Sequence, residues 1–251
     1  MSKVNPTSAI PGLSLSVSES DSAAFGGMIV RNDVKSDVDA YVDDVAALAS
    51  GDIFIHADLS GVIQSQTRST VTSSGGSAAG EGNSIAVNAV IVANVVNTSA
   101  DAYAKDSSLT TTGSGDIDLQ AEIESKIDAT IAANVESNGH GIGVVLAFNT
   151  VGWAAQNFLF NTVDAIIGSS IGTMTSASMN ARTENTTINA AGDVSVTADS
   201  DAAIDARITN SNSTISATPA GGSDTISVGA ILAMNKVATD VDASIKTAST
   251  L

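Results

Sequence analysis

The sequence of 251 residues has no cysteine, three prolines, and only one tryptophan, two tyrosines and five phenylalanines. Without cysteine, a small disulfide scaffold, a thiolate metal site and a cysteine nucleophile are excluded. Lys and Arg number ten against 27 Asp and Glu, for a formal net charge of −17. Nucleic acids and anionic lipid surfaces are bound mainly through Lys and Arg, so neither is an expected partner.

The chain also lacks a long apolar run. No stretch reaches the ~18–20 residues of a membrane-spanning helix, and the longest, Ile85 to Val96, is interrupted by Asn88 and Asn94. The first residues have no apolar signal-peptide core. We therefore expect no membrane insertion, interpret residues 1–23 as an N-terminal segment or start, and interpret the chain, which stops within a repeat at Leu251, as a piece of a longer protein.

What the chain does contain is alternation. From Ile117 to Val135 apolar or small residues occupy every second position, and Asp, Glu, Gln, Lys and Thr fill most of the positions between them. Side chains of a strand point alternately to opposite faces, so this period indicates a strand with one buried and one solvated face. The apolar residues are chiefly Ala, Val and Ile, which suit narrow, repetitive layers better than a globular interior with large anchors.

Two features recur along the chain. The first is Gly-Asp followed by an alternating strand, at Gly51, Gly115 and Gly192. The second is an apolar run that ends in asparagine, at Asn32, Asn94, Asn149 and Asn235, followed by a segment resembling Val-Asp-Ala-Tyr-Val. Gly51 and Gly115 are 64 residues apart and Asn32 and Asn94 are 62 apart. A period of roughly sixty residues predicts stacked units that cannot each bury a core alone.

The fold class predicted from this pattern is all-β. We expect one repetitive body over residues 24–251, built as a parallel β-helix or β-solenoid. Strands of about twenty residues could instead pair antiparallel as a broad prism, and this alternative stays open at the level of sequence. The runs Ile85–Val96 and Ile142–Val151 are apolar on both faces, which predicts strands covered on both sides.

The third unit breaks the period through an excess segment at residues 152–173. Within it Leu159, Phe160, Val163, Ile166 and Ile167 have helical spacing, and Gly168 follows as a stop signal. The spacing predicts a helix over residues 153–167. Such a helix would cover an apolar sheet face or an open end, or else dock a partner; covering is favoured because an exposed apolar stripe would be sticky.

Several of these segments resemble the repeats of very large bacterial surface proteins, the filamentous-haemagglutinin-like and leukotoxin-type filamentous adhesins. Asp39-Ala40-Tyr41-Val42 and Asp101-Ala102-Tyr103-Ala104 carry the first half of the motif, and Gly192 to Ala206 carries the second. The third copy, Met179-Asn180-Ala181, has no tyrosine. The resemblance implies a β-solenoid, exported to the bacterial cell surface or the extracellular space and displayed as an elongated stalk or fibre for adhesion.

No residues form a catalytic constellation. The two histidines, His56 and His140, lie on a polar strand face and in a glycine-rich loop, without a second ligand or acid–base partner nearby in sequence. There is no Gly-x-Ser-x-Gly elbow and no phosphate-binding loop. We therefore predict that the chain is not an enzyme and has no catalytic or cofactor-binding residues.

Acidic residues are the remaining candidates for a site. Calcium takes six to eight oxygen ligands, and two groups of aspartates could supply some of them. The candidates are Asp37, Asp39, Asp43 and Asp44, and Asp199, Asp201 and Asp205. Because neither an EF-hand loop nor the calcium-binding nonapeptide is present, a solvated acidic face is the favoured interpretation.

The function expected from sequence is thus a structural or adhesive segment of a large exported bacterial surface protein. Its expected partners are neighbouring repeats of the same chain and a surface glycan or cell receptor. Two alternatives remain: a self-assembling filament subunit that pairs through open solenoid ends, and a calcium- or glycan-binding module.

Overall fold

The structure is a computed structural model that describes residues 22–74, 84–153, 176–214 and 225–246. Within these ranges the chain forms twelve strands and no helix. The predicted helix at 153–167 falls almost wholly in residues 154–175, outside the described part. No helix among the described residues is long and apolar enough to cross a membrane.

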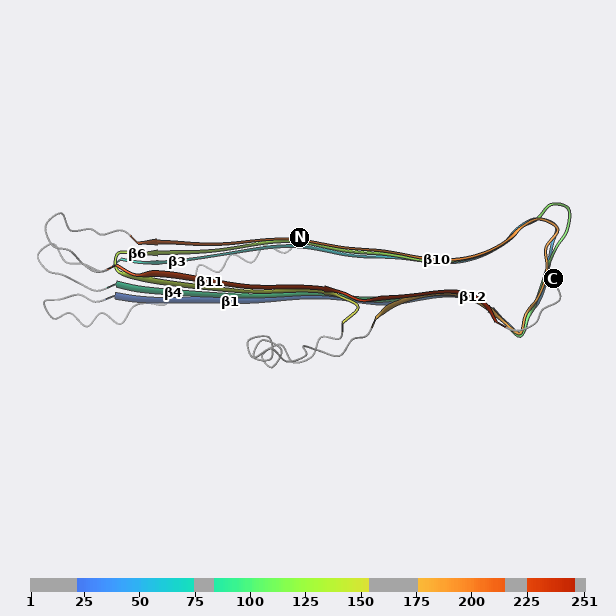
Figure 1. Ribbon diagram of the computed structural model, residues 1–251, viewed down its shortest axis with the longest axis horizontal. Helices are drawn as coiled ribbons and strands as arrows, with labels where there is room; N and C mark the ends of the chain where they lie inside the picture. The colour runs from blue at the N-terminus through green and yellow to red at the C-terminus, as the bar shows by residue number, and fades with distance from the viewer. Residues whose placement is uncertain (1–21, 75–83, 154–175, 215–224, 247–251) are drawn as a thin grey trace, which may run out of the picture.

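Each repeat is one flattened coil, formed by three strands in the first two coils (Figure 1). In the first coil the chain runs along β1 (Ser22–Asp43), turns through the short β2 (Ala46–Ala49) and returns along β3 (Ile53–Ser73). Strands of 21 or 22 residues extend about 70 Å at ~3.3 Å per residue. The two long strands therefore form facing walls, joined at one end by the short strand.

The later coils repeat this path. The second contains β4 (Ser84–Lys105), β5 (Ser108–Thr111) and β6 (Ile117–Ser137). The third contains β7 (His140–Val151), β8 (Ala177–Glu184), β9 (Thr187–Asn189) and β10 (Val194–Thr214). A fourth begins with β11 (Ser227–Val237) and β12 (Thr239–Lys246).

The coils stack into three parallel sheets. Wall 1 contains β1, β4, β7 with β8, and β11 with β12; wall 2 contains β3, β6 and β10; the end sheet contains β2, β5 and β9. Ser22 pairs with Ser84 in wall 1, and Ile53 pairs with Ile117 in wall 2. The roughly sixty-residue period is thus confirmed. Because every described strand pair is parallel, the antiparallel prism is not the fold.

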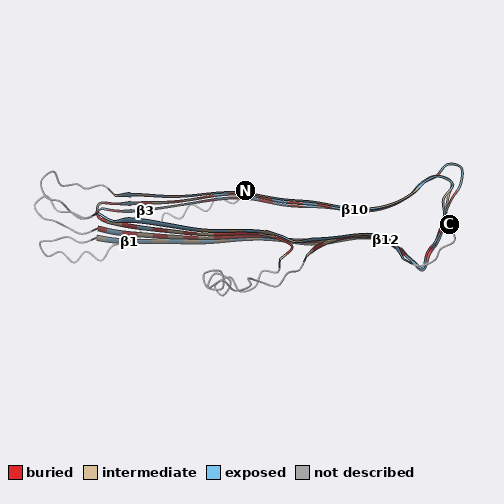
Figure 2. Cartoon of the chain, in the orientation of Figure 1, coloured by how far each residue is buried: buried red, intermediate tan, exposed pale blue. Residues whose placement is uncertain are grey.

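The predicted alternation sorts side chains to the inside and outside of the coil. In β6, Ile123, Ser125 and Ala129 point inward and are buried, whereas Glu122 and Glu124 point outward. The second coil has a neighbour on each side, and its inner residues are the most buried (Figure 2). The inner residues of β1 and β10, which have a neighbour on one side only, are partly buried.

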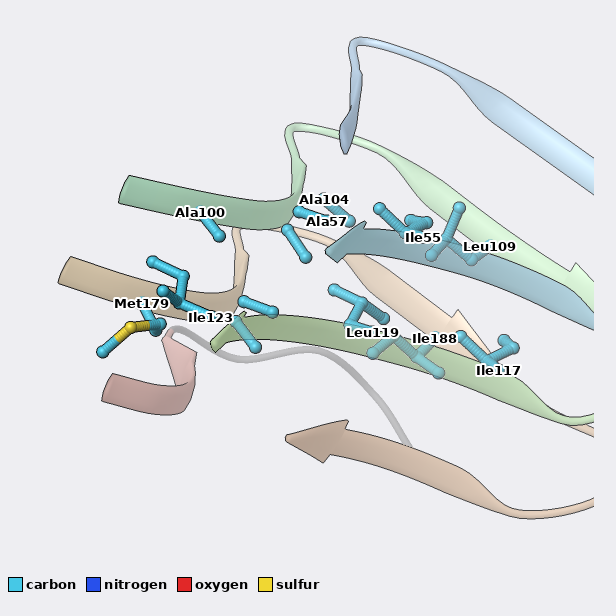
Figure 3. Close-up of a cluster of buried hydrophobic side chains, with 13 residues drawn as sticks. Ile55, Ala57, Ala100, Ala104, Leu109, Ile117, Leu119, Ile123, Met179 and Ile188 are labelled. Carbon is cyan, nitrogen blue, oxygen red and sulfur yellow. The ribbon is translucent and has the colours of Figure 1, made fainter. Parts of the chain in front are cut away.

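The bulkiest part of the core lies where the two walls meet the end sheet (Figure 3). Leu109 and Ile188 come from the end sheet, Ile117 and Leu119 from wall 2, and Met179 from wall 1; all are 0–2% exposed. Three converging sheets leave more room than two facing walls, so this end takes Leu, Ile and Met. Farther along, the space between the walls is filled mainly by Val, Ala and Ile.

The corner between wall 1 and the end sheet depends on one residue per coil. Asp44, Asp106 and Asn185 have φ of 55°, 46° and 47°, a left-handed conformation that Asp and Asn adopt more readily than other non-glycine residues. Asn185 Nδ2 donates to Asp106 Oδ1 at 2.6 Å. This hydrogen bond to the charged form is the main cause that lowers the pKa of Asp106.

The Gly-Asp pairs form the second corner, where the chain enters wall 2. The backbone N–H of Asp116 donates to Asp52 Oδ1 at 2.8 Å, and that of Asp193 donates to Asp116 Oδ1 at 2.7 Å. Asp52 and Asp116 thus each accept a backbone hydrogen bond from the next coil. Gly115 allows the close approach, because a Cβ there would collide with the backbone carbonyl of Gly51.

Wall 1 is interrupted once, in the third coil. β7 ends at Val151, paired with Val96, and β8 pairs from Ser178 with Ser99. β4 continues past the gap without a break, so the excess residues leave the coil between two points that are three positions apart on β4. This location agrees with the excess segment predicted at 152–173. Gly152 has φ of 72°, and a Cβ there would collide with the backbone of Ala238.

Candidate functional surfaces

Four asparagines form a ladder through the interior of wall 1. Asn32 Nδ2 donates to Asn94 Oδ1 at 2.7 Å, Asn94 Nδ2 to Asn149 Oδ1 at 2.8 Å, and Asn149 Nδ2 to Asn235 Oδ1 at 2.8 Å. Asn94 and Asn149 are 0% exposed. Their donors and acceptors would be costly to bury unpaired. The ladder satisfies them only when the coils are in register, so it fixes the register of wall 1.

A different asparagine joins the two walls. Asn88 of β4 is fully buried; its Nδ2 donates to the carbonyl oxygen of Asn134 at 3.2 Å, and its Oδ1 accepts from Ser69 Oγ at 2.8 Å. Both partners belong to wall 2. The two asparagines that interrupt the apolar run at Ile85–Val96 are therefore structural: Asn94 links coils within a wall and Asn88 links the walls.

The outer face of wall 1 divides into an apolar half and a polar half. In the first half of the strands Phe25, Val87, Ile142 and Val228 are aligned across all four coils. Phe25 is 65% exposed and Ile142 40% exposed. Closer to the interruption, outward-facing Ala93, Val95 and Phe148 are at most 8% exposed. The predicted covering of both faces therefore holds near the interruption and not at the strand starts.

Trp153 lies where the chain leaves wall 1. The Lys236 ammonium nitrogen is 4.3 Å from the centroid of its ring. Lys236 follows the inward-facing Asn235 in β11 and therefore points outward. Trp153, at the start of the excess segment, is thus on the outer side of the wall.

The polar half of the outer face carries a stacked aromatic pair. The rings of Tyr41 and Tyr103 are 5.1 Å apart and nearly parallel, and the Arg182 guanidinium is 4.8 Å from the centroid of Tyr103. Arg182 replaces tyrosine in the third coil and continues the stack by a cation–π contact. The tyrosine of the Ala-Tyr motif therefore has a stacking role, and arginine can take its place in the third copy.

The aspartates proposed as calcium ligands lie in two distant places. Asp37, Asp39 and Asp43 point outward from β1, with Asp44 at the corner after it. Asp199, Asp201 and Asp205 point outward from β10 in the opposite wall, at the other end of the stack. Among the described residues no group of three or more His, Cys, Asp or Glu is placed to hold a metal ion. Calcium binding stays an untested alternative to the favoured interpretation, a solvated acidic face.

Wall 2 has a row of acidic neighbours, of which the sequence pattern singled out only Asp199. Asp58, Glu122 and Asp199 are aligned on adjacent strands and point outward. Adjacent strands lie ~4.8 Å apart, so the carboxylates repel one another at low ionic strength. Their alignment follows from the register and could have been found by writing the Gly-Asp copies one above another.

The histidines lie apart from each other. His56 Nε2 is 2.9 Å from Asp118 Oδ2 on the outer face of wall 2, as expected for a polar strand face. His140 begins β7, paired with Ile85, rather than lying in a loop. The glycine-rich loop expected around His140 is shorter than predicted, because β6 runs to Ser137 and β7 begins at His140.

Comparisons with known proteins gave no relative. No family model matches the chain, and no match was found among curated proteins or solved structures. The evidence for the parallel stacked architecture is therefore the register of the strands. The resemblance to filamentous adhesins rests on the repeat motifs alone and stays a prediction.

Proposed function

We propose that this chain is a structural segment of a large exported bacterial surface protein, in which stacked coils form a stiff fibre that displays its outer faces. The observation that carries the proposal is the continuous asparagine ladder from Asn32 to Asn235. Every coil offers the next one the same amide at the same place. The buried amides of each coil are therefore placed to bond with a further coil, which allows the stack to continue.

The outer faces suit exposure to solvent. The net charge is −17, and acidic side chains point outward from both walls. A strongly charged surface keeps an extended body soluble and discourages association of its faces. The polar half of wall 1 and the outer face of wall 2 are thus the surfaces that a fibre would present to a glycan or a receptor.

The dimensions favour a broad fibre over a thin stalk. One coil uses 62–64 residues and adds one strand spacing, ~4.8 Å, along the stacking axis. The same residues provide two walls about 70 Å wide at ~3.3 Å per residue. Each coil therefore contributes much more wall surface than fibre length. Display of surface is thus better supported than the role of a thin stalk.

Immunolabelling of the source organism tests the proposed location. Antibodies raised against residues 22–246 should label intact cells, and brief protease treatment of those cells should remove the signal. An antibody against a cytoplasmic protein, which should label only permeabilised cells, serves as the control. Labelling that requires permeabilisation, or that survives protease on intact cells, would contradict surface display.

A further inference from the structure

The apolar half of the outer face of wall 1 consists of two ridges with a valley between them. The first ridge is the row of Phe25, Val87, Ile142 and Val228. The second ridge lies four residues further along the strands and is formed by Ile29, Ile91, Leu146 and Leu232. The valley is the row between them, Gly27, Ala89, Val144 and Ala230. In every strand the valley residue is smaller than the ridge residue on either side of it.

The ridges are open to solvent in the middle of the stack as well as at its edge. Phe25 and Ile29 of β1 are 65% and 71% exposed. Ile142 of β7 is 40% exposed, although β4 and β11 flank its strand on both sides. Soluble proteins seldom expose a large contiguous apolar patch unless it is an interaction site. This face therefore has the character of an interface.

The same rows are free of the charge that dominates the rest of the surface. Among the described residues, the four rows that begin at Ala23, Phe25, Gly27 and Ile29 contain no Asp, Glu, Lys or Arg, in a chain with 27 acidic residues. His140, paired with Ile85, is the titratable side chain of these rows. Without Lys or Arg the face does not suit anionic lipid. It suits another uncharged apolar face.

We propose that this apolar half is an interface at which a second copy of the chain packs face to face, with the strands of the two copies antiparallel. The two-fold axis would run along the stacking direction, between the first ridge and the valley. The first ridge of each copy would then lie on the valley of the other, so that Val87 of one contacts Ala89 of its partner. Two-fold symmetry pairs one patch with itself, and packed sheets interdigitate their facing side chains.

Charge on the polar half of wall 1 selects the antiparallel orientation. Asp37 and Asp39 point outward from β1, and Asp101 lies beside Asp39 on β4. Parallel strands in the two copies would bring the two polar halves face to face, where carboxylates repel one another. Antiparallel strands that overlap only at the apolar halves send the polar halves to opposite sides of the dimer.

The area of this face is enough for a weak dimer. Its four rows extend about 26 Å along the strands, and its four strands extend about 19 Å across the wall. Two copies would together bury about 1,000 Å², which is the lower limit for a specific interface. We therefore expect a reversible dimer whose population depends on concentration.

The inference goes beyond the proposed function, which concerns a single stack and its display at a surface. In such a fibre the interface would join two stacks side by side. Sedimentation of the purified chain can fail to show a dimer while intact cells are labelled, and the reverse, so the two proposals are tested separately.

Sedimentation equilibrium of the 251-residue chain from ~1 to ~300 µM tests the dimer. Ile142→Asp should weaken it at least tenfold, because the interface would bury an unpaired carboxylate. Val62→Asp is the matched control. Val62 is 44% exposed, points outward from wall 2 and is paired with Lys126, so its replacement should leave the dimer unchanged.

A second variant tests the fit of ridge on valley. Ala89→Leu fills the valley with an apolar side chain, so it should weaken a dimer that depends on this fit. Attraction between any two apolar surfaces would instead become stronger, because the variant exposes more apolar area.

A spin label tests the orientation. Because the chain has no cysteine, Asn97→Cys gives one label per copy, on the outer face of β4. Asn97 lies nine residues from the proposed two-fold axis, so the two labels should be about 60 Å apart in the dimer at ~3.3 Å per residue. Parallel strands would place them less than ~30 Å apart.

Five results would overturn the proposal: a monomer at every concentration, equal loss of dimer in Ile142→Asp and Val62→Asp, a stronger dimer in Ala89→Leu, labels at the short distance, and a dimer that persists in Ile142→Asp. The last would assign association to the ends of the stack. A monomer that dimerises only after residues 154–175 are replaced by a short linker would identify this chain's own segment as the occupant, and would also overturn the proposal.

Discussion

Asparagine 94 shows how one side chain sets the spacing of a whole wall. It accepts from Asn32 and donates to Asn149 while fully excluded from solvent. A one-residue slip would turn the inner row of a strand outward. It would also separate each buried amide from its partner, so the ladder permits only one register. The apolar residues around it provide most of the burial, and the amide selects which register is adopted.

Replacing Asn94 by alanine should destabilise the stack. The change leaves Asn149 Oδ1 without its donor, and a buried polar group without a partner costs about 1–3 kcal/mol. We expect the free energy of unfolding to fall by about 2 kcal/mol or more, measured by urea denaturation. Asn97→Ala, three residues later on the outer face of the same strand, is the control and should change stability by less than ~0.5 kcal/mol. Equal losses in the two variants would show that the ladder has no special role.

The sequence predicted the position of these asparagines but not their chemistry. Their spacing marked Asn32, Asn94, Asn149 and Asn235 as equivalent, which the registers confirm. Whether they pointed inward could not be decided where both faces of the run are apolar. Asn88 likewise appeared as a mere interruption, because its partners, Ser69 and the Asn134 carbonyl, come from wall 2.

At the scale of the element, the Gly-Asp corner distinguishes an end coil from an inner one. A Cβ at Gly115 would collide with the carbonyl group of Gly51, whereas a Cβ at Gly51 would meet nothing within 4 Å. The two glycines occupy the same place in successive coils, and no coil precedes the first one in the described residues. They therefore form a matched pair for mutation.

Gly115→Ala should cost about 1–3 kcal/mol, the usual range for forcing extra atoms into a packed site. Gly51→Ala should be neutral or slightly stabilising, because alanine restricts the unfolded chain without a clash. Thermal unfolding of the two variants beside the parent checks this. The corner would be more tolerant than its geometry indicates if both variants melted at the parent temperature.

The carboxylate row on wall 2 should make stability depend on salt. Glu122 lies between Asp58 and Asp199, so Glu122→Lys replaces two repulsive cross-strand pairs by two attractive ones, each contributing ~0.2–1 kcal/mol. We expect a higher melting temperature at low salt and a gain that disappears in ~1 M NaCl, where the Debye length is ~3 Å.

Glu136→Lys is the control for this prediction. It is the same substitution on the same strand, but its neighbours across the sheet are Thr72 and Ser213. A salt-sensitive gain in the control of the same size would assign the effect to net charge and not to the row. The row itself was predictable in principle, since it needs only the alignment of the Gly-Asp copies.

For the whole molecule, the coil is the natural unit of mechanical unfolding. Each coil contacts mainly the coils beside it, so a stack under tension can lose coils one at a time. Because the chain has no cysteine, cysteines introduced at Ser22 and Lys246 would give unique attachment points for pulling.

Single-molecule pulling should show steps of about 190–215 Å from the first two coils, which span 62 and 55 residues between equivalent asparagines, at ~3.3–3.6 Å per extended residue. The third coil, which includes the excess segment, spans 86 residues and should give a longer step of about 295 Å by the same conversion. A single lengthening of the whole chain would show instead that the coils unfold as one cooperative body.

The architecture was predictable from the sequence to the level of strands, period and Gly-Asp corners. It was not predictable that the strands would form two facing walls closed by a short end sheet. That arrangement depends on which of the two apolar rows of a strand turns inward, and on the packing of Ile55, Leu109 and Leu119, from two different sheets, into one buried cluster.

The interruption at Val151 has a consequence for how such a chain can vary. β4 on one side and β11–β12 on the other pass the gap with a continuous register. The length of chain between Gly152 and Ala177 is therefore decoupled from the spacing of the coils. In evolutionary terms, insertions and deletions at this point leave the register of every strand unchanged. Sequence changes can therefore accumulate at this one position while the surrounding coils are inherited intact.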